Sequence, residues 1–166
     1  MEPVRDTDQP GAVCYRVTPE LYLGYARGNF GNPEGVSRDQ PHDYRDPGRH
    51  MESTAYLDGR WKVEQESARV ENAGAALRLR YTAREVNLVM GPGATGAVKV
   101  EITLSDGEHP GTDVKTDSGR AIINVDRPRM YNLVDNETVN QGAIELKALD
   151  AGLAAYAFTF TSCTIA

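Results

Sequence analysis

The stretch ALRLRYTAREVNLVMGPGATGAVKVEITL, residues 76–104, decides the fold class of this chain. Apolar residues alternate with polar ones at Leu77, Leu79 and Tyr81, and the same alternation returns over residues 98–104 after a glycine-rich segment. A period of two places successive apolar side chains on one face of a β-strand. The stretch therefore predicts amphipathic strands, whose apolar face must be covered by a second layer.

The rest of the sequence offers strands for that second layer and almost no helix. Runs of strand length recur between turn-forming residues, and the last one, residues 156–161, alternates aromatic residues with small ones. A helix-start signal occurs only at Thr18-Pro19-Glu20, and it supports a single helical turn ending near Leu23. We predict an all-β, jelly-roll-like β-sandwich of about ten short antiparallel strands, with one short N-terminal helical turn.

The length of 166 residues suits one domain with a substantial core of its own. Residues 1–12 are polar and contain two prolines and a glycine, so we expect a flexible lead-in or linker there. Residues 13–166 are then predicted to form a single β-sandwich domain. Residues 24–50 are irregular and rich in Gly and Pro, and an irregular segment of that length in a compact domain usually serves binding.

Charge and hydropathy exclude several classes of function. The net charge is -6 and no stripe of basic residues occurs, which argues against a nucleic-acid partner. The apolar runs are too short to span a membrane, and the polar N-terminus lacks the apolar segment of a signal peptide. We therefore expect either a cytosolic protein or an exported piece of a longer chain.

Two motifs suggest cofactor or metal chemistry, and neither has the context that such chemistry requires. Gly91-Pro92-Gly93-Ala94-Thr95-Gly96 fits the G-x-G-x-x-G pattern, but a strand pattern follows it where a dinucleotide site needs a helix. We interpret it as a hairpin loop. His42 and His50 lie near several acids, yet their spacing matches no metal motif. The sequence thus predicts neither a cofactor nor a metal, and no nucleophile with a neighbouring base stands out.

The two cysteines, Cys14 and Cys163, lie near opposite ends of the sequence. That spacing matches no zinc or dithiol motif. If the first and last strands of a sandwich lie side by side, a disulfide between them is possible. Two buried free thiols are an equally good interpretation.

The aromatic residues provide the best candidates for a ligand surface. The pattern does not assign Tyr22, Tyr25, Tyr44, Trp61 and Tyr131 to a core face, and an exposed cluster of them could stack on sugar rings. For Trp61, burial between the sheets is the favoured alternative.

Several segments together resemble the C-terminal domain of DipZ-type and related thioredoxin-like proteins, from about residue 13 to 163. They are TPELYLGY (18–25), RDQPHDY (38–44), LDGRW (57–61), VNLVM (86–90) and AYAFTF (155–160). The resemblance implies a jelly-roll domain, similar to a carbohydrate-binding module, that accompanies a thioredoxin-fold domain in the same or a separate chain. The catalytic Cys-x-x-Cys of that partner domain is absent from this sequence, so the resemblance implies an accessory domain and not an enzyme.

Three functions follow as hypotheses. The first is a non-catalytic binding or docking domain that positions a thioredoxin-like partner on a glycan or protein substrate. Its candidate ligand-binding residues are Arg38, Asp39, His42, Asp43, Tyr44, Tyr22 and Trp61. The second is a purely structural domain that packs on the redox domain, and the third is a relay disulfide formed by Cys14 and Cys163 in a redox enzyme.

Overall fold

The structure is a computed structural model that describes residues 3–5 and 12–165, and the side chains of residues 15–162. The strands are β1 (Pro3–Arg5), β2 (Ala12–Tyr15), β3 (Leu21–Tyr22), β4 (Pro41–Tyr44), β5 (Ala55–Val63), β6 (Ala68–Val70), β7 (Ala76–Gly91), β8 (Val98–Leu104), β9 (Lys115–Asp117), β10 (Arg120–Val125), β11 (Arg129–Ala148), β12 (Ala154–Thr161) and β13 (Cys163–Ile165). No helix occurs among these residues, and the described part of the chain therefore has no helix that could cross a membrane.

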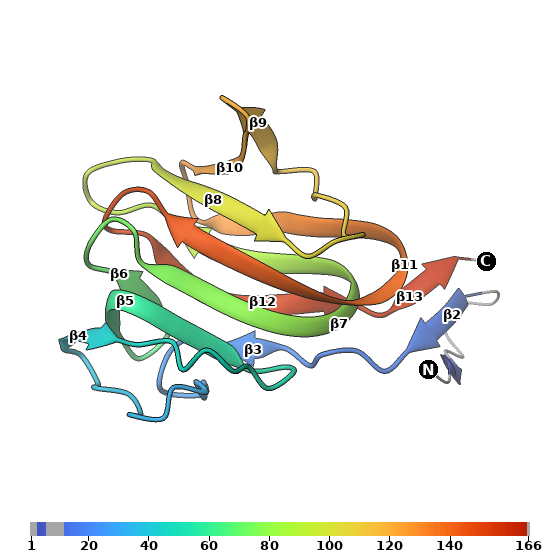
Figure 1. Cartoon of the computed structure of the whole chain (residues 1–166), viewed down its shortest axis with the longest axis horizontal. Coiled ribbons are helices and arrows are strands. Elements are labelled where there is room, and N and C mark those ends of the chain that lie inside the picture. The colour runs from blue at the N-terminus through green and yellow to red at the C-terminus, as the bar shows by residue number, and fades with distance from the viewer. Residues whose placement is uncertain (1–2, 6–11, 166) are drawn as a thin grey trace.

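The long antiparallel pair β7 and β11 organises the fold. The first half of β7 pairs with the second half of β11, and its second half pairs with the first half of β11. The register shifts between Asp135 and Asn140 of β11, where extra residues form an irregularity that bends a strand pair. Figure 1 shows both strands turning back at the same end of the molecule. Each strand therefore contributes to both layers of the sandwich.

The other strands extend these two layers at their edges. The second half of β7 pairs with β12, which also pairs with β3 and β6. On the other layer, β5 flanks the first half of β7 and carries β4 at its edge, while β8, β10 and β9 follow β11. All these strand pairs are antiparallel, so the predicted all-β sandwich is confirmed.

The core is one continuous cluster between the layers. Its largest fully buried side chains are aromatic: Trp61, Tyr81, Tyr131 and Phe158. The alternation seen in the sequence is observed here, because Leu77, Leu79 and Tyr81 point into this core while Arg78 and Arg80 point away from it. Full burial of one large apolar side chain contributes about 1.5–3 kcal/mol, so this cluster supplies most of the driving force for folding.

Two local predictions are wrong. The expected helical turn at 19–23 is absent, and Leu21–Tyr22 instead form β3, paired with Phe158 and Ala157 of β12. One turn of helix is costly to nucleate, and pairing with a core strand provides the same backbone partners together with burial. The segment Gly91–Gly96 is not a hairpin loop, because β11 lies between β7 and β8. This segment carries the chain from one layer to the other.

The two ends of the chain form a small separate sheet in the order β1-β2-β13. The register places Cys14 of β2 opposite Cys163 of β13. Residues 6–11 of the predicted lead-in lie outside the described residues, while Pro3–Arg5 pair with β2. The predicted boundary between a lead-in and a domain at residue 13 stays a prediction.

Candidate functional site

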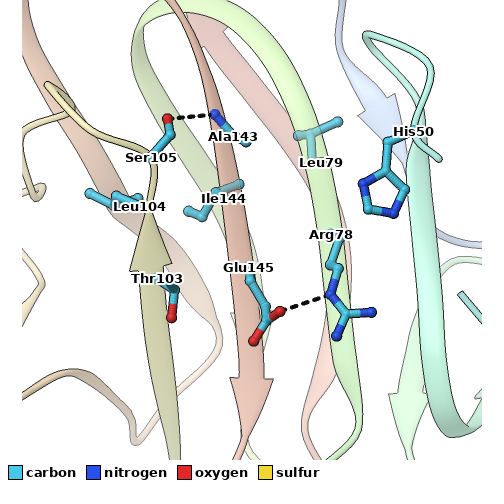
Figure 2. Close-up of a pocket in the computed structure, with 9 residues that line it drawn as sticks. All are labelled: His50, Arg78, Leu79, Thr103, Leu104, Ser105, Ala143, Ile144 and Glu145. Atoms are coloured by element: carbon cyan, nitrogen blue, oxygen red, sulfur yellow. Dashed lines mark hydrogen bonds and ion pairs between the residues drawn. The ribbon is translucent and has the colours of Figure 1, made fainter. Parts of the chain in front are cut away.

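A groove lies over β7, β11 and β8, and its lining includes outward residues such as Arg78 as well as core residues such as Leu79 and Ile144. It consists of two adjoining hollows of about 250 Å³ and 220 Å³ that share Ser105 and Ala143. We call it the sheet groove. Its lining consists of residues 78–81 of β7, 103–105 at the end of β8, 141–145 of β11, and His50 and Glu52 from the loop before β5. Figure 2 shows the first hollow, with the side chains of Leu104, Ile144 and Leu79 across its middle and the ion pair of Arg78 and Glu145 forming a charged wall below them.

Arg78 holds the charged wall of the sheet groove in place. Its Nε donates to Glu145 Oε2 at 2.7 Å, and its Nη1 donates to Asp46 Oδ2 at 3.0 Å and to Asp58 Oδ2 at 3.2 Å. Glu145 lies directly opposite Arg78 in the β7–β11 register, so strand pairing brings this ion pair together. Burial alone would lower the pKa of Arg78, but Glu145 and Asp46 raise it. The guanidinium therefore stays charged and fixed.

The loop 45–53 closes this wall through Asp46 and His50. The Nε2 atom of His50 lies 2.7 Å from Asp46 Oδ2, and the Gly48 amide donates to Asp46 Oδ1 at 2.7 Å. Burial would raise the pKa of Asp46, but the hydrogen bonds from Gly48, Arg78 and His50 outweigh it and lower this pKa. Asp46 is thus an ionised link between an irregular loop and the sheet.

The second hollow combines exposed polar groups with a buried hydroxyl. Arg80 and Gln141 are exposed at its rim, and Arg80 Nη1 donates to the His50 carbonyl oxygen at 3.0 Å. Below them the hydroxyl of Tyr81 is fully buried beside the Glu108 carboxylate. Burial and the nearby Glu108 carboxylate raise the pKa of Tyr81. A Cβ atom at Gly142 would collide with Glu108 Oε1 and lie 2.7 Å from the Tyr81 hydroxyl, so a larger residue there would have to displace these side chains.

The sheet groove offers donors and acceptors that no described group already uses. The side chains of Thr103 and Gln141 form no hydrogen bond within the described part of the chain, and the same holds for Glu145 Oε1. The Ser105 Oγ accepts from the Ala143 amide at 2.9 Å, which leaves its proton free to donate. The floor at Ala143 and Leu104 is apolar. An apolar floor with a few fixed polar groups is typical of a small-ligand site.

The loop residues predicted as ligand contacts form a second cluster. Tyr25 donates its hydroxyl proton to Asp39 Oδ2 at 2.7 Å, and that hydrogen bond raises the pKa of Tyr25. The Arg38 guanidinium lies over the Tyr25 ring, 5.0 Å from its centroid. Both Arg38 and Asp39 are exposed, so the structure brings these two predicted residues together with Tyr25 at the surface.

The other predicted contacts lie apart from this cluster, and two of them are in the core. Trp61 and Tyr44 are only 2% and 3% exposed, so their rings offer no face to a ligand. His42 packs edge-on against Tyr44, and Asp43 pairs with Arg60 at 3.0 Å on the exposed edge strand β4. The Tyr22 ring is covered by the Arg27 guanidinium at 3.9 Å. These residues therefore do not form a single surface of exposed aromatic rings.

Comparison with known families accounts for most of the chain. The sequence model of the thioredoxin-like C-terminal domain matches residues 18–161. The chain belongs to this family. A search of curated proteins finds no match to it. The resemblance noted from the sequence is confirmed at the level of the thioredoxin-like C-terminal domain, and the family description indicates an accessory domain of a thioredoxin-like protein.

The structure bears on two further predictions for this thioredoxin-like C-terminal domain, which concern the cysteines and a metal site. The backbone of Cys14 faces that of Cys163, but the predicted bridge concerns side chains outside those that the structure describes. Among the described side chains, no group of three or more His, Cys, Asp or Glu residues is arranged to hold a metal ion.

The sequence pointed to the loop cluster and missed the sheet groove. Arg78 and Arg80 occupy the solvent-facing positions of an amphipathic strand, where charged residues are ordinary. Their role depends on Glu145 lying opposite Arg78, a pairing of residues 67 positions apart. One sequence signal could have revealed this ion pair. It is the presence of a Glu in one strand and an Arg in another, both at outward-facing positions of the alternating pattern.

Proposed function

We propose that this chain is a non-catalytic ligand-binding domain, which accompanies a thioredoxin-fold domain and holds a carbohydrate in the sheet groove. The observation that carries the proposal is the apolar floor at Ala143 and Leu104, bordered by polar groups that the Arg78 network fixes in place. Side chains fixed before binding lose little conformational entropy when a ligand arrives.

The polar groups at the groove favour a ligand with several hydroxyls. A hydroxyl can both donate and accept, and the groove presents an acceptor at Glu145 Oε1, donors at Arg80, and both kinds at Gln141 and Thr103. The fixed acids also outnumber the fixed bases at the Arg78 wall, because Asp46, Asp58 and Glu145 all pair with one arginine. This balance supports a neutral sugar over an anionic ligand in the groove.

A binding experiment tests this proposal. Neutral oligosaccharides are titrated into the ¹⁵N-labelled chain, and amide shifts of residues 103–105 and 141–145 are followed. The double variant Thr103→Ala/Gln141→Ala should bind at least about fivefold more weakly, because each lost hydrogen bond is worth about 0.5–1.5 kcal/mol. The matched control Gln65→Ala/Thr116→Ala changes exposed residues that do not line the groove and should bind like the wild type.

A panel in which no oligosaccharide shifts the groove amides would contradict carbohydrate binding. The structural hypothesis, a domain that packs on the redox domain without a ligand of its own, would then be the better account. Equal weakening by both double variants would instead show that the groove is not the site.

A disulfide between Cys14 and Cys163 is a second proposal, supported by the register of the terminal sheet. The Tyr15 amide donates to the Ser162 carbonyl oxygen at 3.1 Å, which makes Tyr15 and Ser162 a hydrogen-bonded pair. The adjacent pair Cys14 and Cys163 is then a non-hydrogen-bonded pair. Such pairs have Cα atoms about 4.5 Å apart, within the range of about 4.4–6.8 Å that a disulfide requires.

A thiol count checks the disulfide. The denatured chain, purified without reductant, should contain no reactive thiol and should gain both thiols after reduction. In the chain-entropy model, closing so long a loop stabilises the fold by up to about 5 kcal/mol, so reduction should lower the melting temperature. Two free thiols in air-oxidised protein would rule out the bridge and the relay function that depends on it.

A further inference from the structure

The loop after β3 encloses a cavity of about 240 Å³ that the sheet-groove proposal does not use. It is lined by the rings of Tyr25 and Phe30, the polar side chains of Arg38 and Asn29, and backbone at two glycines. It shares no lining residue with the sheet groove. The cavity therefore needs an explanation of its own.

Arg38 is the cation at this cavity, and among the described residues its side chain contacts the Tyr25 ring. It is exposed, and no described acidic side chain forms an ion pair or hydrogen bond with it. The neighbouring acids are already engaged: Asp39 accepts the Tyr25 hydroxyl, and Glu64 pairs with Arg69 at 2.8 Å. A guanidinium presents a planar fork of donors that matches a carboxylate in a bidentate arrangement.

The cavity is held in shape by contacts to the end of β5. Asp39 adopts a left-handed backbone conformation, with φ of 59°, and its amide donates to the Val63 carbonyl oxygen at 2.8 Å. The Tyr25 amide donates to the Glu64 carbonyl oxygen at 3.0 Å. Non-glycine residues rarely adopt this conformation, and they cluster at ligand clamps. The backbone of Tyr25, which lines the cavity, and of Asp39, which follows Arg38, is thus fixed before any ligand arrives.

We propose that the loop cavity binds a carboxylate carried on a six-membered ring. The carboxylate pairs with the free fork of Arg38, and the ring packs against Tyr25 and Phe30, which supply apolar area beside the charge. Asn29 adds a donor and an acceptor for a ring substituent. The ring is that of a sugar acid or of an aromatic acid, and the experiment distinguishes these two sources.

Separate titrations with sodium D-glucuronate and sodium benzoate test the site, with amide shifts of residues 25–38 as the readout. At least one of the two acids should shift these amides. Arg38→Gln should weaken its binding at least about tenfold, because it removes a charge-assisted, bidentate contact. The control Arg16→Gln removes the same charge from an exposed residue that does not line the cavity and should bind like the wild type. The amide spectrum of each variant also reports whether it is folded.

The outcomes of these titrations decide whether the loop cavity binds a ring carboxylate and which kind. Glucuronate binding alone identifies a sugar acid, and benzoate binding alone identifies an aromatic acid. Sodium sulfate that shifts the same amides as strongly would show an unspecific anion contact and overturn the proposal, as would equal weakening by Arg38→Gln and Arg16→Gln. The absence of any shift with both acids also overturns it. The sheet-groove proposal is unaffected by these results, because neutral sugars and the amides of β8 and β11 report on it.

Discussion

The β7–β11 pair and residues 24–54 are built on different principles. The pair is held by a continuous backbone ladder, and its inward side chains fill the core. Residues 24–54 contain only the short strand β4, and single hydrogen bonds help attach them to the sheet, such as that from the Asp39 amide to the Val63 carbonyl oxygen at 2.8 Å. The ladder gives rigidity that does not depend on any one surface residue. Single contacts leave polar groups such as Arg38 free for ligands.

If this comparison is right, truncating a core side chain in the strands around β7 causes the largest loss of stability. Phe158 of β12 lies opposite Leu88 of β7 and is fully buried. Phe158→Ala should therefore lower the free energy of unfolding by about 3–5 kcal/mol, as truncation of a buried aromatic ring does. Denaturant titration monitored by circular dichroism measures the change. Thr159→Ala, on the outward face, should cost less than about 1 kcal/mol. Losses of equal size would mean that the register of β12 is wrong.

The alternation in the sequence locates the strands of the first region, but it does not show that the longest ones are continuous. Up to Ala83 the side chains that point into the core belong to odd-numbered residues, and from Val86 onward they belong to even-numbered ones. This shift in the alternation suggests two separate strands. The structure has one strand, β7, because the register of its pairing with β11 shifts next to Asp135, and the alternation changes there without a break in the strand. Asn140-Gln141-Gly142 likewise lies inside β11, although its residue types are typical of turns. A local pattern cannot separate a bulge from a turn, since the difference depends on the partner strand.

The site could be predicted less well than the fold. Alternation places Arg78 on the outer face, but its partners come from β11, β5 and the loop 45–53, and only the topology brings them together. The prediction for the loop residues was better for Arg38 and Asp39, which are exposed, than for Trp61 and Tyr44, which are buried. Aromatic residues in a loop-rich segment serve equally well as core or as surface, and local sequence does not distinguish the two.

A single buried amide tests how residues 24–54 are attached. Asn32 is 4% exposed, and its side chain both donates to the Leu57 carbonyl oxygen and accepts from the Leu57 amide, each at 2.8 Å. Asn32→Ala leaves these buried backbone groups of β5 without partners, so it should cost about 2–3 kcal/mol. Asn29→Ala, an exposed amide in the same segment, should change stability by less than about 0.5 kcal/mol. Thermal and denaturant unfolding of both variants measures the contrast, and a mild Asn32→Ala would imply that the ladder also holds this segment.

The smallest expected effect concerns Asp46, and it depends on pH. The pKa of Asp46 is lowered in the folded state, so the folded state favours its ionised form. Its contribution to stability is therefore fully present above the unfolded-state pKa of about 3.9, and it is lost as the pH falls through the lower folded-state pKa.

Asp46→Asn should accordingly destabilise the fold by about 1–2 kcal/mol at neutral pH, since it removes charged hydrogen bonds to Arg78 and His50. This difference from the wild type should shrink steadily as the medium is acidified below about pH 4, because the wild-type carboxyl then also loses its charge. Urea unfolding at a series of pH values measures it. Asp43→Asn is the matched control, because the ion pair of Asp43 with Arg60 is exposed and contributes little. A constant difference at every pH would mean that the Asp46 charge does not hold the loop 45–53 on the sheet, and that packing alone attaches it.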